Sequence, residues 1–125
     1  MLSLAVHQDI KGMTGIKNIP ISSILYISSR DRDRVAVHTS DNTYYMIGTL
    51  IYWENVLNNS GYHFLNVDRS NTINVDNVVC VNEIFKDAYF EHNKTKASKK
   101  CPIASHRYEA IVRELKVLKQ DIVII

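Results

Sequence analysis

Short segments in which apolar and polar residues alternate dominate this chain, and turn residues interrupt each of them after a few positions. Leu2, Leu4 and Val6 alternate with polar neighbours at the start, and Val35 and Val37 do so further along. Alternation with a period of two is typical of a strand with one buried face. The sequence therefore predicts a meander of short antiparallel strands. We expect these strands in LSLAVHQ, around Ile24–Ile27, in RVAVHT, TYYMI, HFLNV, STINV, VVCVNEIF and AYFEH, and in the edge strand CPIAS.

Two segments change to the period of a helix. In TLIYWENVLNNSG, Leu50, Trp53 and Leu57 fall on one face, Thr49 can cap the start and Gly61 can end the helix. A second helix is expected after Ser105, its predicted cap, with an apolar stripe of Tyr108, Ile111, Val112, Leu115 and Leu118. The fold class predicted is mostly β (α+β), with short antiparallel sheets, two short helices and no internal repeat.

The length of 125 residues predicts one domain with a single core. A content of 46% hydrophobic and 22% charged residues is that of a folded globular chain. We expect the core over about residues 2–118, followed by an apolar tail over 119–125. That tail is either a packed terminal strand or a contact for a partner or a second protomer.

No apolar run approaches the roughly 18 residues that cross a bilayer, and MLSLAVHQDIKG lacks the features of a secretory signal. A cytoplasmic protein without a membrane partner is therefore expected. Cys80 and Cys101 are expected to be reduced there, since neither belongs to a CxxC pair.

Catalytic and metal-binding motifs are not evident in the sequence. The five histidines do not form HExxH, and GxSxG, GxxxxGK[ST] and GxGxxG are all missing. With four glycines, the chain has no phosphate-cradling loop. We therefore expect no enzyme activity, no catalytic residues, no metal and no cofactor.

The charge is small overall but unevenly distributed. The net charge is +2, whereas NKTKASKKCPIASHR, residues 93–107, contains no acid. Such a local basic segment either attracts a polyanion or is a solvated loop without a partner. Its basic residues are Lys94, Lys96, Lys99, Lys100 and Arg107.

Two other segments have side chains suited to DNA. VDRSNTINVDNV, residues 67–78, has strand-type apolar residues interrupted by Arg69, Ser70 and Asn74. Arg and Ser bond phosphate oxygens and Asn bonds base edges, although turn asparagines also bond their own backbone. In RDRDR, residues 30–34, Arg34 either belongs to a salt-bridged turn or reaches a phosphate.

The order of these segments resembles a LytTR-type DNA-binding domain from about Leu2 to Leu118. IPISSILYISS is similar to the family's strand "I-x-x-I-x-Y-I", and FLNVDRSNTINVDNV to its central "F-x-x-x-x-R-S-x-x-(V/I)-N". CPIASHRYEAIVREL is similar to the late "P-(V/I)-S-x-x-(R/Y)" that opens the last helix. The order and spacing of these blocks carry the resemblance more than any single block.

The resemblance implies an elongated, mostly β regulator of bacterial transcription that binds double-stranded DNA through loops. Two loops would enter successive major grooves and one would lie over the minor groove between them. The matching positions are the RDRDR turn with Asp33 and Arg34, the Asn74 segment, and Arg107. Polar residues of the 67–78 segment would then face DNA. The contact residues expected in all are Arg34, Arg69, Ser70, Asn74, Lys99, Lys100, Ser105 and Arg107.

The chain departs from the family pattern at three places. Asp33 falls where some relatives have a base-reading histidine, Asp68 replaces a basic or polar residue, and the usual serine is shifted by Ala104 to Ser105. An acid at position 33 accepts only from cytosine and is repelled by phosphate. The alternative function is therefore a protein-interaction module of the same fold with little or no specific DNA reading.

Further expectations concern assembly. Most LytTR-type domains follow a receiver domain, so the chain is either a stand-alone regulator or a fragment of a longer one. Related domains often occupy two direct repeats in a promoter. We expect a monomer in solution, with a second protomer joining it on DNA.

Overall fold

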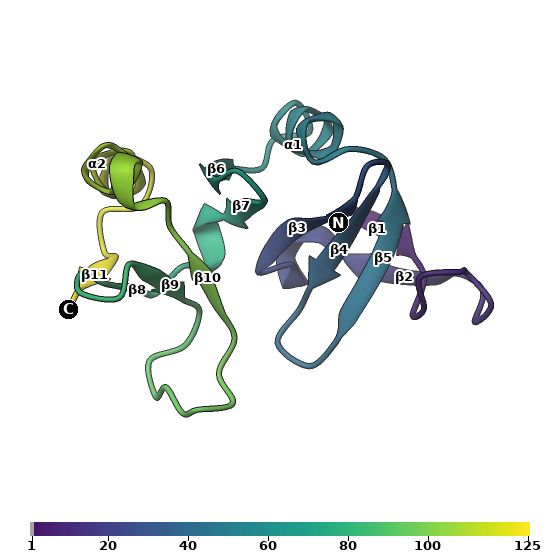
Figure 1. Ribbon diagram of the computed structural model, residues 1–125, viewed down its shortest axis with the longest axis horizontal. Coiled ribbons are helices and arrows are strands. Elements are labelled where there is room, and N and C mark those ends of the chain that lie inside the picture. The colour runs from purple at the N-terminus through teal and green to yellow at the C-terminus, as the bar shows by residue number, and fades with distance from the viewer. Residues whose placement is uncertain (1) are drawn as a thin grey trace.

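The structure is a computed structural model that describes residues 2–125, and it is mostly β. Three small sheets and two α-helices form within the described residues, spread along the long axis of the molecule (Figure 1). The predicted fold class is confirmed. None of the helices in the described part of the chain has the length and apolar character needed to cross a membrane.

The three sheets follow the chain from its N-terminus to its C-terminus. Strands β1 and β2 form an antiparallel hairpin, the second sheet has the order β5-β4-β3-β7-β6, and the third has the order β10-β9-β8-β11. Strand β10 lies at a sheet edge, as Pro102 predicts. The strands are β1 (Ser3–Val6), β2 (Lys17–Pro20), β3 (Tyr26–Asp31), β4 (Arg34–His38), β5 (Thr43–Ile47), β6 (Phe64–Asp68), β7 (Asn71–Asn74), β8 (Cys80–Asn82), β9 (Asp87–Tyr89), β10 (Lys100–Pro102) and β11 (Val123–Ile124).

Helix α1 (Leu50–Asn58) forms as its sequence predicts. Its N-cap is Thr49, whose side-chain oxygen accepts a hydrogen bond from the Tyr52 amide at 3.1 Å. Beyond its C-terminal end, Gly61 has φ +94°, a backbone conformation that glycine adopts without strain.

Helix α2 (Tyr108–Leu118) begins later than predicted. Ser105 does not cap it: Ser105–Arg107 form a 3-10 turn, η3, and the N-cap is Arg107, which makes no side-chain capping bond within the described chain. The predicted stripe is partly confirmed, because Tyr108, Ile111 and Leu115 are buried whereas Leu118 is 41% exposed.

The buried apolar residues form two clusters that divide the chain in the middle. Those of the first lie between Val6 and Phe64, and those of the second between Val67 and Ile122. Val67, Ile73 and Val75, expected to anchor the 67–78 segment, are fully buried in the second cluster.

The two halves repeat one order of elements, which the sequence analysis did not anticipate. Each half has a hairpin (β1-β2; β6-β7), a 3-10 turn (η1, Ile21–Ser23; η2, Val75–Asn77), a three-stranded meander (β3-β4-β5; β8-β9-β10) and an α-helix. The expectation of no internal repeat is therefore wrong for the order of the elements. The repeat is not visible in the sequence, because a buried position requires an apolar residue but not the same residue in both halves. The same spacing separates the buried residues Ile19, Ile21, Ile24 and Ile27 in the first half and Ile73, Val75, Val78 and Val81 in the second.

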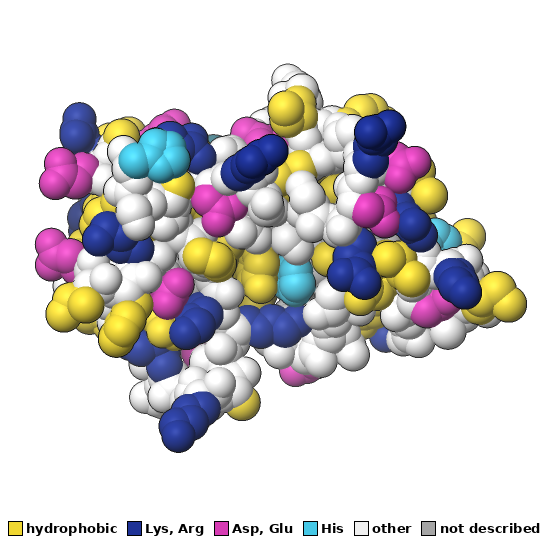
Figure 2. Space-filling view, in the orientation of Figure 1, with side chains coloured by type: hydrophobic (Ala, Val, Ile, Leu, Met, Phe, Trp, Pro, Cys, Tyr) yellow, Lys and Arg dark blue, Asp and Glu magenta, His cyan; other side chains and the backbone are white. Residues whose placement is uncertain are grey.

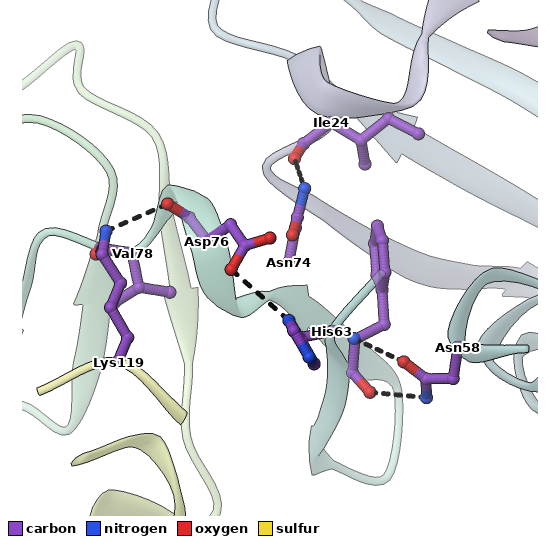
Figure 3. A network of polar contacts seen from close by, with 8 residues as sticks. Ile24, Asn58, His63, Asn74, Asp76, Val78 and Lys119 are labelled. Atoms are coloured by element: carbon purple, nitrogen blue, oxygen red, sulfur yellow. Dashed lines mark hydrogen bonds and ion pairs between the residues drawn. The ribbon is translucent and has the colours of Figure 1, made fainter. Parts of the chain in front are cut away.

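Side-chain amides join the two halves at their 3-10 turns (Figure 3). The Asn74 Nδ2 donates to the Ile24 carbonyl at 2.9 Å, and the Asn77 Nδ2 donates to the same carbonyl at 2.7 Å. At the C-cap of α2, the Lys119 ammonium donates to the carbonyls of Asp76 and Val78 at 2.9 and 2.7 Å. Asn74 and Asn77, two of the polar residues that interrupt the 67–78 segment, therefore bond a backbone carbonyl at an irregular turn.

The C-terminal tail packs as a terminal strand. Ile122 is buried, and β11 pairs in parallel with β8, so this pair departs from the otherwise antiparallel ladders. In the described residues both cysteines are free and buried. Strand β9 lies between them, with Tyr89 opposite Cys80 and Ala88 opposite Cys101, a separation of about 9–10 Å that is too wide for a disulfide.

Candidate nucleic-acid interface

Three loops that are distant in the sequence converge on one face of the molecule. The turn between β6 and β7 is tied to β3, because the Ser29 amide donates to the Ser70 carbonyl at 2.9 Å. The η3 turn is tied to β6, because the Ala104 amide donates to the Val67 carbonyl at 2.8 Å. The β6–β7 turn therefore lies between the β3–β4 hairpin and the start of α2.

The β6–β7 turn exposes its basic residue and its serine. The Asp68 carboxylate accepts hydrogen bonds from the Ser70 amide at 2.7 Å and from the Asn71 Nδ2 at 2.9 Å. These bonds close an Asx-type turn, and Arg69 and Ser70 at its tip are exposed. Asp68, a departure from the family pattern, thus has a local structural role.

Arg107 is held next to this turn by a strand residue. Its guanidinium Nη2 donates to the Asn66 Oδ1 at 2.9 Å. Arg107 also stands at the N-cap of α2, where the unpaired backbone N–H groups of a helix favour an anion. The sequence analysis did not single out Asn66, although an asparagine within a strand is a weak signal of a special role.

The β3–β4 hairpin contributes a different arginine from the one predicted. Arg34 is paired with the Asp31 carboxylate at 3.0 Å, and it also donates to the Ile10 carbonyl at 3.1 Å. Arg32, at the tip, instead lines an open hollow of about 720 Å³ together with Arg69 and Asn66. Sequence reasoning missed Arg32, because nothing in RDRDR indicates which arginine the fold pairs internally.

We call Arg32, Arg69, Ser70 and Arg107, with Asn66 beneath them, the arginine face. Asp31 and Glu54 also line the hollow beside these residues. Figure 2 shows Lys and Arg side chains dispersed among Asp and Glu on the side of the molecule in view. Attraction of a polyanion would therefore depend on local groups such as the arginine face more than on the net charge of +2.

Lys99 and Lys100 do not join the arginine face. They flank the end of the β9–β10 connection, which projects at the lower edge of Figure 1 beside the β4–β5 turn, while α1 and α2 follow the upper edge. The Lys99 ammonium donates to the Asn42 carbonyl at 2.6 Å, and burial lowers the pKa of Lys99. Lys100 lies 3.7 Å from the Asp87 carboxylate.

Asn74 points into the protein rather than away from it. Its side chain is 1% exposed and its amide bonds the Ile24 carbonyl (Figure 3). The side chain therefore does not project to solvent as the sequence interpretation expected, because it bonds the carbonyl at the end of η1. A DNA contact by Asn74 stays a prediction. Arg69, Ser70 and Asp76 are the exposed residues of the same segment, and Ser105 is exposed in η3.

A metal centre has no ligand set within residues 2–125, since no three His, Cys, Asp or Glu side chains gather there in positions to hold an ion. His38, for example, packs within the protein. It stacks on Tyr26 with ring centroids 4.1 Å apart and contacts the Ser28 hydroxyl at 2.9 Å.

A mostly β fold with arginines from three loops near one another has the charge and geometry of a domain suited to a polyanion. The family model described as the LytTr DNA-binding domain matches residues 14–116, and the chain therefore belongs to the LytTR family of DNA-binding domains. The resemblance recognised in the sequence is confirmed.

A solved structure supports the fold. It is the LytTr DNA-binding domain of a protein described as a methyl-accepting/DNA response regulator from Bacillus cereus, with a TM-score of 0.66 and 17% sequence identity. The alignment covers 90% of this chain and 94% of that chain. A comparison with curated proteins gave no match.

Proposed function

We propose that this protein is a sequence-specific, double-stranded DNA-binding regulator of transcription that uses the arginine face to read its site. The observation that carries the proposal is the convergence of Arg32, Arg69 and Arg107 from three separate loops, held together by the Ser29–Ser70 and Asn66–Arg107 hydrogen bonds. Family membership supports DNA binding in general.

The order of the loops along the face suggests how each would meet the duplex. Arg107 and Arg32 lie on either side of the β6–β7 turn, so we assign them to successive major grooves. Arg69 and Ser70, between them, would lie over the intervening minor groove and its phosphates. A bidentate contact from an arginine to guanine reads a base, whereas phosphate contacts position the protein without reading sequence.

Arg34, Lys99 and Lys100 take a smaller part in this proposal. Each is bonded within the protein, and a phosphate would have to compete with the Asp31 carboxylate, the Asn42 carbonyl or the Asp87 carboxylate. We assign Ser105, exposed beside Arg107, to a phosphate contact.

The test is selection from a pool of random duplexes by electrophoretic shift, followed by sequencing of the bound fraction. We expect one motif to be enriched, as two direct repeats if a second protomer joins on DNA. A bound fraction with the composition of the input pool would contradict specific reading and favour the protein-interaction module. Sedimentation of the protein alone should show a monomer; a tight dimer without DNA would contradict assembly on the repeats.

A further inference from the structure

Asn66 holds Arg107 through an amide whose orientation is determined by its neighbours. The Asn66 Nδ2 donates to the Asn71 carbonyl at 3.2 Å and to the Thr72 hydroxyl oxygen at 3.4 Å. Turning the amide over would place Oδ1 against the Asn71 carbonyl, which is solely an acceptor. The Asn66 oxygen must therefore face Arg107, whose Nη2 is 2.9 Å away.

The network behind Asn66 is partly buried and reaches another element. Thr72 is fully buried in β7, and its hydroxyl donates to the Glu54 carboxylate of α1 at 3.2 Å. Its oxygen is thus free to accept from the Asn66 amide. The guanidinium of Arg107 is consequently positioned by strands β6 and β7 and by α1, although Arg107 itself belongs to the turn before α2.

The partner of Arg107 is neutral, and this distinguishes Arg107 from Arg34. Arg34 is paired with the Asp31 carboxylate at 3.0 Å, which compensates its charge. An amide oxygen engages one N–H group of Arg107 and leaves the positive charge uncompensated. A guanidinium has five N–H groups in a planar fork, so further groups remain for a bidentate contact.

We propose that Asn66 is a positioning residue that determines how strictly the base facing Arg107 is selected. This inference rests on the proposed function. Asn66 restricts the rotamers of a long side chain before DNA arrives, so less conformational freedom is lost when the contact forms. Asn66 also orients the guanidinium of Arg107. A guanidinium in another orientation would form hydrogen bonds with other bases more readily.

The experiment compares wild type with Asn66→Ala, Asn66→Asp, Arg107→Ala and the double variant Asn66→Ala/Arg107→Ala. Each is put through random-duplex selection and titrated against the best wild-type site. Asn93→Ala, in the exposed β9–β10 connection, is the matched control. Thermal unfolding of every variant identifies the temperatures at which it is folded, and DNA binding is measured below them.

We expect Asn66→Ala to weaken the best site about tenfold and to flatten the base preference at the position that Arg107→Ala also flattens. The double variant should be no weaker than Arg107→Ala alone, because Asn66 acts through Arg107. Asn66→Asp should bind worse than Asn66→Ala, since a carboxylate would pair with the guanidinium and hold it away from the bases. Asn93→Ala should match wild type.

Two results would overturn the assignment of Asn66. One is an unchanged base preference in folded Asn66→Ala; the other is a double variant whose loss equals the product of the two single losses. A purely structural role for Asn66 would lower the unfolding temperature without altering preference at one base pair. Wild type that selects no sequence would instead overturn the proposed function.

Discussion

Arginine residues in this protein differ in whether the fold compensates their charge. Arg34 is paired with Asp31 and a backbone carbonyl, whereas Arg107 has a neutral amide as its partner and Arg69 is exposed at a turn. An arginine that is exposed to solvent, or bonded only to a neutral group, can bind DNA without breaking an ion pair. A paired arginine must first give up its carboxylate.

Arg107→Ala should lower affinity for the selected site by about 1–3 kcal/mol and relax preference at one base pair, because a bidentate guanine contact is lost. Arg34→Ala is the matched control: it removes the same side-chain type and should change thermal stability more than base preference. The affinities of both variants are measured by titration against the selected duplex and against a scrambled duplex. A loss that is equal on both duplexes would show that Arg107 contacts phosphate only.

Asn74→Ala should destabilise the fold by about 0.5–1.5 kcal/mol, since it removes one buried hydrogen bond to the Ile24 carbonyl, which still accepts from Asn77. The folded variant should bind the selected duplex as wild type does. Urea unfolding gives the stability change, and binding is then measured without denaturant. Loss of affinity with unchanged stability would instead support a direct DNA contact by Asn74.

Strands and loops are joined across the two halves by an aromatic stack and a lysine. Tyr26 of β3 stacks on His38 of β4 and on Phe90 beyond β9, with ring centroids 4.1 and 5.8 Å apart. Burial, assisted by the nearby Lys99 ammonium, lowers the pKa of His38 to about 4. The neutral imidazole is therefore part of the packed structure.

Stability should consequently fall in mild acid. Unfolded His38 binds its proton near pH 6.5 and the folded protein does so only near pH 4, so the unfolded state holds more protons between these values. The contribution of neutral His38 to the free energy of unfolding is complete above pH 6.5. It decreases by about 3 kcal/mol as the pH falls to 4. His38→Phe keeps a ring in the stack and should show a shallower decline in urea unfolding from pH 7 to 4. If the free energy of unfolding of wild type and of His38→Phe decreased equally over this pH range, the role of His38 would be contradicted.

The molecule as a whole has little net charge, so its affinity for DNA should depend on a small number of phosphate contacts. Three of the four lysines of the 93–107 segment contact the protein itself: Lys94 lies over the Tyr89 ring, and Lys99 and Lys100 have the partners described above. The β9–β10 connection also projects at the lower edge of Figure 1, away from α1 and α2.

The logarithm of affinity should fall with the logarithm of salt concentration at a slope of about 0.9 per phosphate contact. We expect Arg69→Ala to reduce that slope by about one contact on every duplex. Lys96→Ala, which removes one charge from the β9–β10 connection, should leave it unchanged. A lower slope in Lys96→Ala would place this connection on the DNA, and a flat salt response in wild type would contradict DNA binding.

Local sequence determined the type and position of most elements. The alternation around Val35 and Val37, the Thr49 cap and the Pro102 edge strand were all predictable, because each depends on neighbours within a few residues. Val67, Ile73 and Val75 are buried as their apolar character predicts, but Thr72 and Asn74 are buried as well, which alternation does not predict. The family could also be recognised, since the order of its blocks is a property of the sequence.

Tertiary structure alone decided which polar side chains are available for binding. The Ile10 carbonyl engages Arg34, the Ile24 carbonyl turns Asn74 inward and Asn66 positions Arg107, across 24, 50 and 41 residues of chain. A side chain of this kind bonds whichever unpaired donor or acceptor the fold brings within about 3 Å. Sequence periodicity carries no information about such distant partners, so the arginine face is defined only once the two halves have packed.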